Sequence, residues 1–377
     1  MSFRRTRAVA RKEFLHIMRD ARSLILALML PFVMLILFGW ALSLDVDKIP
    51  TIVYDRSRTP ESRDLIRQFT GSRYFQVVAV AASDADVDRS IDRSRALLGI
   101  VIMEDYAKDL LAGRDAQVQL ILDGSDSNTA SIALGYVNGI VQAYAAQLRS
   151  DAQVQKGAVK LKTPVEPRIR VWYNNDLVSR NYIVPGLIAV ILMIIASLLT
   201  SLTIAREWET GTMEQLLSTP VRPTELVLGK LSAYFTLGIT DMLICLFIGV
   251  IVFDVPLKGS VLLLFFSSCL FLFGALCWGI FLSASTRSQL IAYQLGTLTS
   301  FLPAFLLSGF IYAIQDMPVA IQAFTYIVPA RYFVTILKTI FLKGAGLEIL
   351  WGELGFLFLY AAIVFVLATR KLRQKIA

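Results

Sequence analysis

Residues 183–205 read IVPGLIAVILMIIASLLTSLTIA. The stretch contains no charged side chain, and it is longer than the roughly 20 apolar residues that a helix needs to cross a bilayer. The whole chain shares this character, because 56% of its 377 residues are hydrophobic and its mean hydropathy is +0.62. A soluble protein of this size would be more polar, so the sequence predicts a protein that crosses the membrane several times.

Five further segments have the length and apolar content of a membrane span. With the first stretch they predict an α-helical polytopic membrane protein of six transmembrane helices, with an extracytoplasmic α/β domain inserted at residues 45–182. The predicted spans are 24–44, 183–205, 231–253, 261–284, 290–312 and 347–369.

Lysine and arginine near the ends of the spans predict the orientation. Seven lie in residues 1–22 and four follow the last span, in a basic tail at 370–377. Six spans put both ends on one side, so both termini are expected in the cytoplasm and residues 45–182 outside. This outer region holds 18 basic and 18 acidic side chains. The net charge of +8 therefore lies on the membrane part, where it fits topology and contact with anionic lipids rather than nucleic-acid binding.

The N-terminal 23 residues predict a basic amphipathic helix in the membrane interface. An ordinary charged flank that sets topology is the alternative. Its apolar stripe would be formed by Phe3, Val9 or Ala10, Phe14, Ile17 and Met18. The apolar run that follows is about twice as long as the core of a typical signal peptide, which favours an uncleaved anchor over a cleaved signal.

Strand and helix patterns alternate in the outer region. Strands are expected at 49–54, 75–81, 97–103, 118–122 and 168–173, with a polar linker at 151–166. The Thr59-Pro60-Glu61 sequence is typical of a helix start, and a long helix is expected over 128–148. About 130 residues suffice for an α/β domain with its own core.

Cysteine and histidine usage argues against a metal site and against an enzyme. Cys245, Cys269 and Cys277 all fall inside predicted spans, so no disulfide framework or CxxC metal motif is present. His16 is the only histidine of the chain. The outer region has neither residue type, so a membrane-anchored enzyme is the weakest of the functional hypotheses.

The loop at 206–230 reads REWETGTMEQLLSTPVRPTELVLGK and is expected on the cytoplasmic side. Four glutamates crowd it, although a membrane surface is itself negative. Thr212 is a candidate N-cap for a short helix that Pro220 ends, and Pro223 stiffens the turn into the next helix. A stiff polar helix of this kind predicts a docking surface, and a solvated connector is the alternative.

This loop resembles the cytoplasmic motif of type-2 ABC exporter permeases, which ends in Leu-Leu-x-Thr-Pro. The resemblance implies a coupling helix that fits a groove on a separate ATPase subunit. It extends over the whole chain: Arg11-Lys12-Glu13-Phe14 resembles the connecting helix, and drug-exporter-like members place a domain between spans one and two. The matched coupling positions are Arg206, Glu207, Glu209, Gly211, Thr212, Glu214, Leu216, Leu217, Thr219 and Pro220.

A second matching stretch is LPAFLLSGFIYAIQDMPVAIQAFTYIVPARYF at 302–333. In the family this part ends the fifth span and forms a re-entrant hairpin at the outer leaflet, expected here over 313–346. Glycine and proline interrupt its apolar runs, so no clean span fits, and irregular backbone at membrane depth must be buried or line a cavity. The residues expected to shape the hairpin are Asp316, Pro318, Pro329 and Arg331, and Arg331 could pair with Asp316 or a lipid phosphate.

Polar residues inside the spans are candidates for the substrate pathway. Asp241 is the most costly of them, because a charge in a span usually faces a bundle interior or water. In the family, the second and fifth spans of two subunits border the central cavity. Helix–helix packing is the competing interpretation of small hydroxyl residues. The candidates are Ser197, Thr200, Ser201, Asp241, Tyr293, Gln294, Thr297 and Ser300.

The sequence lacks a phosphate-binding loop, because Gly229-Lys230 is followed by Leu231. The resemblance therefore implies that ATP and magnesium bind two copies of a partner ATPase, and that this chain binds no cofactor. It also implies a second permease subunit, identical or a close paralogue, in a bacterial inner membrane, with a periplasmic adaptor as a further candidate partner. A hydrophobic or amphipathic substrate would be exported by alternating access. The alternative is force transmission or signalling through the outer domain without transport.

Overall fold

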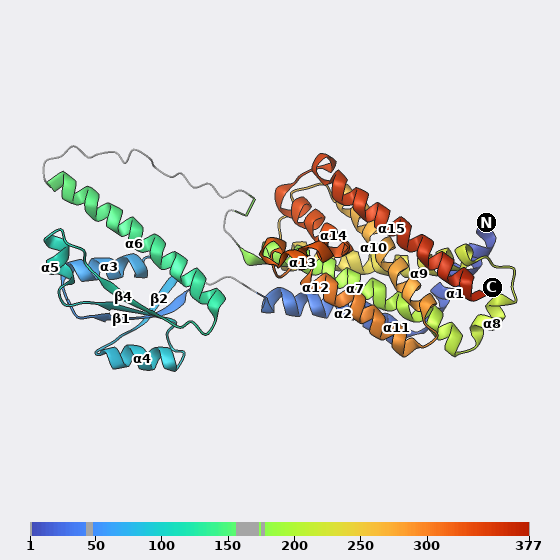
Figure 1. Cartoon of the computed structure of the whole chain (residues 1–377), viewed down its shortest axis with the longest axis horizontal. Helices are drawn as coiled ribbons and strands as arrows, with labels where there is room; N and C mark the ends of the chain where they lie inside the picture. The colour runs from blue at the N-terminus through green and yellow to red at the C-terminus, as the bar shows by residue number, and fades with distance from the viewer. Residues whose placement is uncertain (1, 43–47, 156–172, 175–177, 377) are drawn as a thin grey trace. The chain divides into compact units, whose positions relative to one another are not determined.

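The computed structural model describes residues 2–42, 48–155, 173–174 and 178–376. The chain divides into two compact units, one formed by Met1–Ser43 and Arg170–Ala377 and the other by Leu44–Ile169. The first unit is helical and the second is built on a β-sheet (Figure 1). The predicted strand at 168–173, apart from its last residue, and most of the predicted linker lie outside the described residues.

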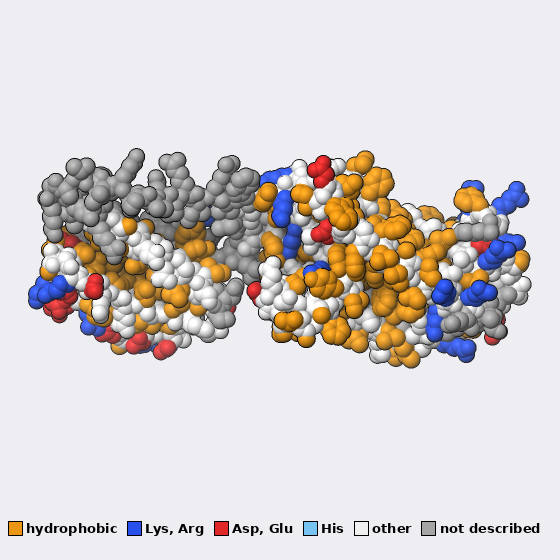
Figure 2. All heavy atoms as spheres, turned by 45° about the horizontal axis from the view of Figure 1, so that its top comes forward, with side chains coloured by type: hydrophobic (Ala, Val, Ile, Leu, Met, Phe, Trp, Pro, Cys, Tyr) orange, Lys and Arg blue, Asp and Glu red, His pale blue; other side chains and the backbone are white. Residues whose placement is uncertain are grey.

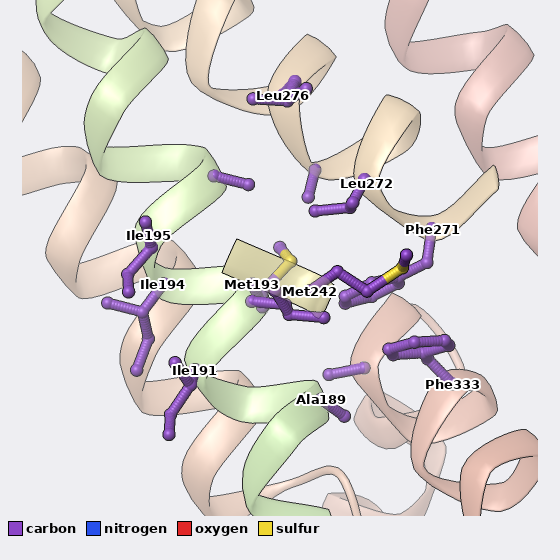
Figure 3. Packing of buried hydrophobic residues seen from close by; sticks show 14 of the residues in the cluster. Ala189, Ile191, Met193, Ile194, Ile195, Met242, Phe271, Leu272, Leu276 and Phe333 are labelled. Carbon is purple, nitrogen blue, oxygen red and sulfur yellow. The ribbon is translucent and has the colours of Figure 1, made fainter. Parts of the chain in front are cut away.

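Helix α7 (Ser179–Glu209) is the centre of the helical unit. Every residue from Ile183 to Ser197 is buried, as expected for a helix that is apolar on all sides. The helices that pack against it include α2 (Ala21–Ala41), α9 (Pro223–Phe247), α10 (Val261–Ser285), α11 (Gln289–Gly296) and α14 (Pro329–Lys338) (Figure 1). Figure 3 shows apolar side chains of α7, α9, α10 and α14 meeting in this core, where the rings of Phe271 and Phe333 stack 4.1 Å apart.

Close approach of two helices depends on a glycine. A Cβ atom on Gly279 of α10 would lie 2.0 Å from Thr200 Oγ1 and 2.4 Å from the backbone oxygen of Ser197 on α7. Small residues permit this close approach. Close packing matters in membrane proteins because lipid is as apolar as the side chains, so the hydrophobic effect does not drive helices together. The Thr200 hydroxyl then donates to the Leu276 carbonyl of α10 at 3.0 Å.

Among the described residues, four helices are long and apolar enough to cross a membrane: Ser179–Glu209, Pro223–Val252, Val261–Ser285 and Leu347–Arg373. The last belongs to α15 (Leu347–Ile376), and the second joins α9 to a π-helical turn at Ile248–Val252. A helix pair at Val319–Thr325 and Pro329–Lys343 passes the same test as one span bent by 82°. The helical polytopic class is thus confirmed with four or five candidate spans, and the number six stays a prediction.

The predicted first and fifth spans differ from these four. In α2 the apolar helical stretch found among the described residues is Ala27–Ala41, which is shorter than a candidate span. The fifth is a helix of three pieces, α11, a π-turn at Thr297–Phe301 and α12 (Leu302–Leu306), and it ends at Leu306 rather than residue 312. The backbone leaves the helical conformation at the C-cap Leu307, which has a φ of −107°, and Gly309 two residues later has a positive φ of 76°.

The segment after this helix is broken into short pieces: a 3-10 turn at Ile314–Asp316, α13 (Val319–Thr325), α14 and a π-turn at Thr339–Lys343. Pro318 caps α13 and Pro329 is the first residue of α14, positions where a missing amide hydrogen costs little. The bend between α13 and α14 is that of a broken span or a re-entrant loop.

The second unit is an α/β sandwich. Its sheet has the order β2-β1-β3-β4, with bounds β1 (Ile49–Asp55), β2 (Phe75–Val80), β3 (Leu98–Ile102) and β4 (Val118–Leu122). Strand β1 pairs in parallel with β2 and β3, and β4 is antiparallel. Helices connect the parallel strands, as such crossovers require. These crossovers are α3 (Pro60–Thr70), after β1, and α4 (Asp84–Asp92), after β2. Helix α5 (Tyr106–Leu111) joins β3 to the antiparallel β4, and α6 (Ser127–Gln155) follows β4.

Two apolar cores flank this sheet. Residues of α3 and α6, such as Phe69 and Val137, pack on one face, and Val87 of α4 packs on the other. Thr59 and Ser62 form a capping box at the start of α3, with Pro60 at the first helical position. Helix α6 runs seven residues beyond the predicted end at 148, so the start of the predicted linker is helical.

Candidate functional site

The loop between α7 and α9 contains a six-residue helix, α8 (Thr212–Leu217). Its N-cap is Gly211, which has a φ of 71°, so the prediction of Thr212 as the N-cap is wrong. Glycine takes this position because the chain must turn sharply after α7 and the left-handed conformation costs glycine little. Thr212 is the first helical residue, and its hydroxyl lies 3.0 Å from the hydroxyl of Thr210.

One face of α8 is anchored and the other is open. Met213 is completely buried in the helical core and Leu216 is half-buried against it. Glu214 and Gln215 are exposed, and Thr219 and Pro220 are exposed just after the helix. The side chain of Leu217 lies outside the described residues. The helix is therefore held through its buried face and exposes an acidic side chain on the opposite face.

Glu207 does not face outward but closes a cluster of four charges, which we call the α1 ion-pair cluster. Its Oε1 lies 2.7 Å from Lys12 Nζ and 3.1 Å from Lys230 Nζ, and Lys230 is also 2.9 Å from Glu13 Oε1. Three of the four side chains are at least nine-tenths buried. Burial alone would raise the pKa of Glu13, but the ammonium groups of Lys230 and Lys12 hold it below its ordinary value.

Glu209 is also held within the chain. Its carboxylate accepts hydrogen bonds from the backbone nitrogen of Gln289, at 2.7 Å, and from the Gln289 side-chain amide. Gln289 is the first residue of α11, so the negative charge lies at the positive end of that helix. Arg206 Nε is 3.4 Å from the Gln289 side-chain oxygen. These two matched positions thus join α7 to α11.

Helix α1 (Phe3–Arg19) was predicted from the sequence as an interfacial helix, but its contacts with α9 and Glu207 were not. It packs along α9, where a Cβ on Gly229 would lie 2.6 Å from Val9 Cβ. Glu225 accepts from the Ser2 backbone nitrogen at 2.6 Å, and Arg5 donates to the Pro220 carbonyl. The signal was Glu13, which lies one helical turn after Val9 and therefore on the same inward face.

The predicted apolar stripe on α1 is divided by this packing. Val9 is buried, whereas Phe3 and Met18 are exposed, by 80% and 54%. Exposed apolar side chains are also numerous elsewhere in the helical unit, as Figure 2 shows on one face, where lysine and arginine gather toward one end. A continuous apolar flank of this kind is typical of a surface that meets lipid or another subunit.

The candidates for the substrate pathway fall into two groups. Ser197, Thr200, Ser201 and Ser300 are buried within one subunit, and the hydroxyls of Ser197 and Ser300 are 2.6 Å apart. Tyr293 and Gln294 are exposed and Thr297 is half-buried on the same helical run. The structure does not bring the eight residues to one surface.

Asp241 is completely buried on α9. Neither of its carboxylate oxygens has a hydrogen-bond partner among the described residues. Cys245, one helical turn further along, is buried as well. The site therefore holds an uncompensated acid, which is costly in an apolar interior.

In the hairpin, Arg331 contacts Thr325 and stacks 4.0 Å over the Tyr326 ring, and no ion pair between Arg331 and Asp316 is present among the described residues. Arg331 instead contacts the Tyr326 ring and the Thr325 hydroxyl, which are nearer to it along the chain than Asp316. A further cation that the sequence did not single out is Lys338, whose Nζ lies 3.3 Å from the centre of the Tyr182 ring and donates to the Gly309 carbonyl at 3.0 Å. Within the described residues, no group of His, Cys, Asp and Glu could hold a metal ion.

Comparison with known proteins shows which family the chain resembles. The family described as ABC-2 family transporter protein matches residues 21–370. The chain is 37% identical to the probable multidrug ABC transporter permease YbhS of Escherichia coli K12 over 376 residues, which is all of this chain and 98% of that protein. It is 31% identical to the probable multidrug ABC transporter permease YbhR of the same organism, over 99% of this chain and 100% of that protein. It is also 28% identical to the inner membrane transport permease YhhJ of Escherichia coli K12, over 87% of this chain and 86% of that protein.

These matches and the helical polytopic fold define a membrane permease. The chain belongs to the ABC-2 transporter family, and the matched region includes the whole α/β unit and the helical unit from α2 to residue 370. The loop that contains α8 is thus part of an ABC transporter permease.

Proposed function

We propose that the chain is the permease subunit of an ATP-driven exporter whose ATPase is a separate subunit. Two permease subunits, identical or closely related, would assemble with two ATPase subunits. The proposed substrate is hydrophobic or amphipathic, and it leaves the cytoplasm or the inner leaflet by alternating access. The multidrug permeases named above support a substrate of this kind.

The proposed topology has six spans in a bacterial inner membrane. The broken helix at 289–306 and the apolar helix α2 would complete the set begun by the four long helices. The α/β unit would lie outside the cytoplasm, where it could contact an adaptor. An uneven distribution of lysine and arginine supports this orientation.

The observation that carries the coupling role is the anchoring of α8. Its inner face is buried through Met213, and both preceding glutamates, Glu207 and Glu209, are held by the bundle. A displacement of α8 would therefore be transmitted to α1, α7 and α11, because α8 is held too firmly to move independently of them. A partner groove with positive charge would complement Glu214.

The test is charge reversal at Glu214, whose side chain is exposed on α8 and makes no hydrogen bond or ion pair with the part of the chain that the structure describes. We expect Glu214→Arg to weaken co-purification of the ATPase subunit and to abolish stimulation of ATP hydrolysis, because like charges would face each other across the interface. Glu348→Arg is the matched control, since Glu348 is an exposed acid in the first turn of α15. Equal ATPase association and equal transport in both variants would refute docking through α8.

A further inference from the structure

Two exposed lysines, Lys258 and Lys343, are held side by side in the helical unit, and we call them the lysine pair. The backbone nitrogen of Lys258 donates to the Phe341 carbonyl at 3.1 Å, and a Cβ on Gly344 would lie 3.3 Å from Lys258 Cβ. Both ammonium groups approach Tyr173. Lys258 Nζ donates to its carbonyl oxygen at 2.9 Å, and Lys343 Nζ lies 5.9 Å from the centre of its ring.

The positive charge of the lysine pair is not neutralised within the described part of the chain. Asp254 and Glu348 are the acids nearest to the two lysines along the sequence, and no ion pair joins either acid to them there. Each ammonium group has three N–H donors, and Lys258 spends one on a backbone carbonyl. Two adjacent cations with unused donors repel each other and attract an anion.

The lysine pair lies at the end of the helical unit that is farthest from α8. Helix α9 and its π-turn, Pro223–Val252, lead from α8 to the loop that carries Lys258 and comprise 30 residues. At 1.5 Å per residue they are about 45 Å long, which is the thickness of a bilayer with its headgroups. On the proposed topology this end lies outside the cytoplasm, where the orientation rule does not favour lysine. The two cations therefore have no topological explanation.

The two helices that begin at the lysine pair run side by side. Helix α10 starts three residues after Lys258, and α15 starts four residues after Lys343. A Cβ on Gly274 of α10 would lie 3.0 Å from the Tyr360 ring of α15, and each of these residues is 13 positions after the start of its helix. The helices are therefore parallel, and their first turns lie at the same level.

The first turns of both helices expose apolar side chains. Leu262 of α10 is exposed, and so are Leu347 and Trp351, which lie one turn apart on α15. Tryptophan is enriched where a membrane protein passes the headgroup region, and lysine reaches the phosphates at the same boundary. Cations followed along two helices by exposed apolar side chains match the order of headgroup and acyl chain in a lipid.

We propose that the lysine pair binds the phosphate group of an anionic phospholipid, whose acyl chains lie along the first turns of α10 and α15. Both ammonium groups donate to phosphate oxygens, and such charge-assisted hydrogen bonds are stronger than neutral ones. A zwitterionic lipid offers the same phosphate but adds a cation of its own, which the lysine pair repels. The site requires the membrane-spanning fold and does not depend on the proposed export function.

Trp351 is a reporter for this site, because bromine atoms on a lipid chain quench tryptophan fluorescence on contact. The purified full-length protein is placed in phosphatidylcholine nanodiscs that contain increasing fractions of chain-brominated phosphatidylglycerol or chain-brominated phosphatidylcholine. The difference between the unmodified protein and Trp351→Phe isolates the signal of Trp351. We expect half-maximal quenching at an about tenfold lower fraction of phosphatidylglycerol, because two lysines contribute to its binding. Equal quenching by the two lipids would overturn the proposal.

The double variant Lys258→Gln with Lys343→Gln should lose this preference. Lys258→Arg with Lys343→Arg should keep it, which separates the effect of charge from that of a local structural change. Arg370→Gln is the matched control, because Arg370 is an exposed cation at the other end of α15. An unchanged preference in the glutamine variant would exclude the site. Inorganic phosphate should not relieve the quenching, and relief by phosphate would mean that the site binds a free anion rather than a lipid.

Discussion

Lys230 on α9 donates a 2.9 Å hydrogen bond to Glu13 on α1, and the two side chains are only 1% and 5% exposed. They are 217 positions apart in the chain. The pair therefore fixes the N-terminal helix to α9, close to Glu207 at the end of α7 that precedes α8. Because both charges are buried, removal of one leaves the other with a single remaining partner, Lys12 for Glu13 or Glu207 for Lys230, and breaking a buried pair costs about 3–5 kcal/mol.

The first prediction concerns this pair. Lys230→Met should destabilise the helical unit by about 3–5 kcal/mol, since Glu13 and Glu207 would then share only the half-exposed Lys12. Thermal unfolding of the purified protein, followed by its intrinsic tryptophan fluorescence, measures the loss of stability. The double variant Lys230→Met with Glu13→Gln should recover part of it, because the buried negative charge is removed. Lys108→Met, an exposed lysine of the α/β unit, is the control and should have no effect.

The second prediction is the pH dependence of α1 packing. The pKa of Glu13 is lowered in the folded protein, so its stabilisation is complete above the ordinary glutamate value of about 4.5. It is lost as the pH falls below that value and through the folded pKa. Hydrogen exchange of α1 should therefore accelerate in acid, and in Glu13→Gln this acceleration should be weaker. Equal acid sensitivity of the two proteins would show that other carboxylates release the helix.

The third prediction compares two glycines in long apolar helices. Gly279→Ala should destabilise the protein, because the new Cβ would lie 2.4 Å from a backbone oxygen of α7 that cannot move alone. Overpacking of this kind costs about 1–3 kcal/mol. Gly355→Ala on α15 meets nothing within 4 Å and should be neutral or slightly stabilising, since alanine has the higher helix propensity. Thermal inactivation in one detergent ranks the two variants, and equal stability would mean that α7 and α10 are less closely packed.

Much of the helical architecture could be predicted from composition, because apolar runs such as 183–205 must be buried in protein or lipid. The α/β pattern of residues 49–122 was equally legible, since turn and cap residues such as Thr59 and Pro60 mark the helix starts. The predicted C-terminal boundary of the fifth span was less accurate. A π-turn lies before its end and a positive φ at Gly309 follows it, and neither leaves a periodic signal in the sequence.

The candidate site was only partly predictable. The motif located the loop, but a linear pattern does not separate glutamates that face a partner from glutamates that hold the loop in place. Glu207 and Glu209 find their partners 195 and 80 positions away, at Lys12 and Gln289. Such pairings depend on the three-dimensional arrangement of α1, α7 and α11, which local propensity does not encode.

The fourth prediction concerns Glu209 and tests whether this glutamate holds the loop in place rather than contacting a partner. Its carboxylate satisfies the first backbone amide of α11, and loss of a helix cap costs about 1 kcal/mol. Glu209→Ala should therefore speed hydrogen exchange over residues 289–296 by about fivefold while ATPase association is largely retained. Glu214→Arg should show the opposite pattern, with normal exchange in α11 and weak ATPase association. If Glu209→Ala instead abolished association and left α11 protected, Glu209 would have to contact the ATPase directly, and its bond to Gln289 would have to break when the subunits assemble.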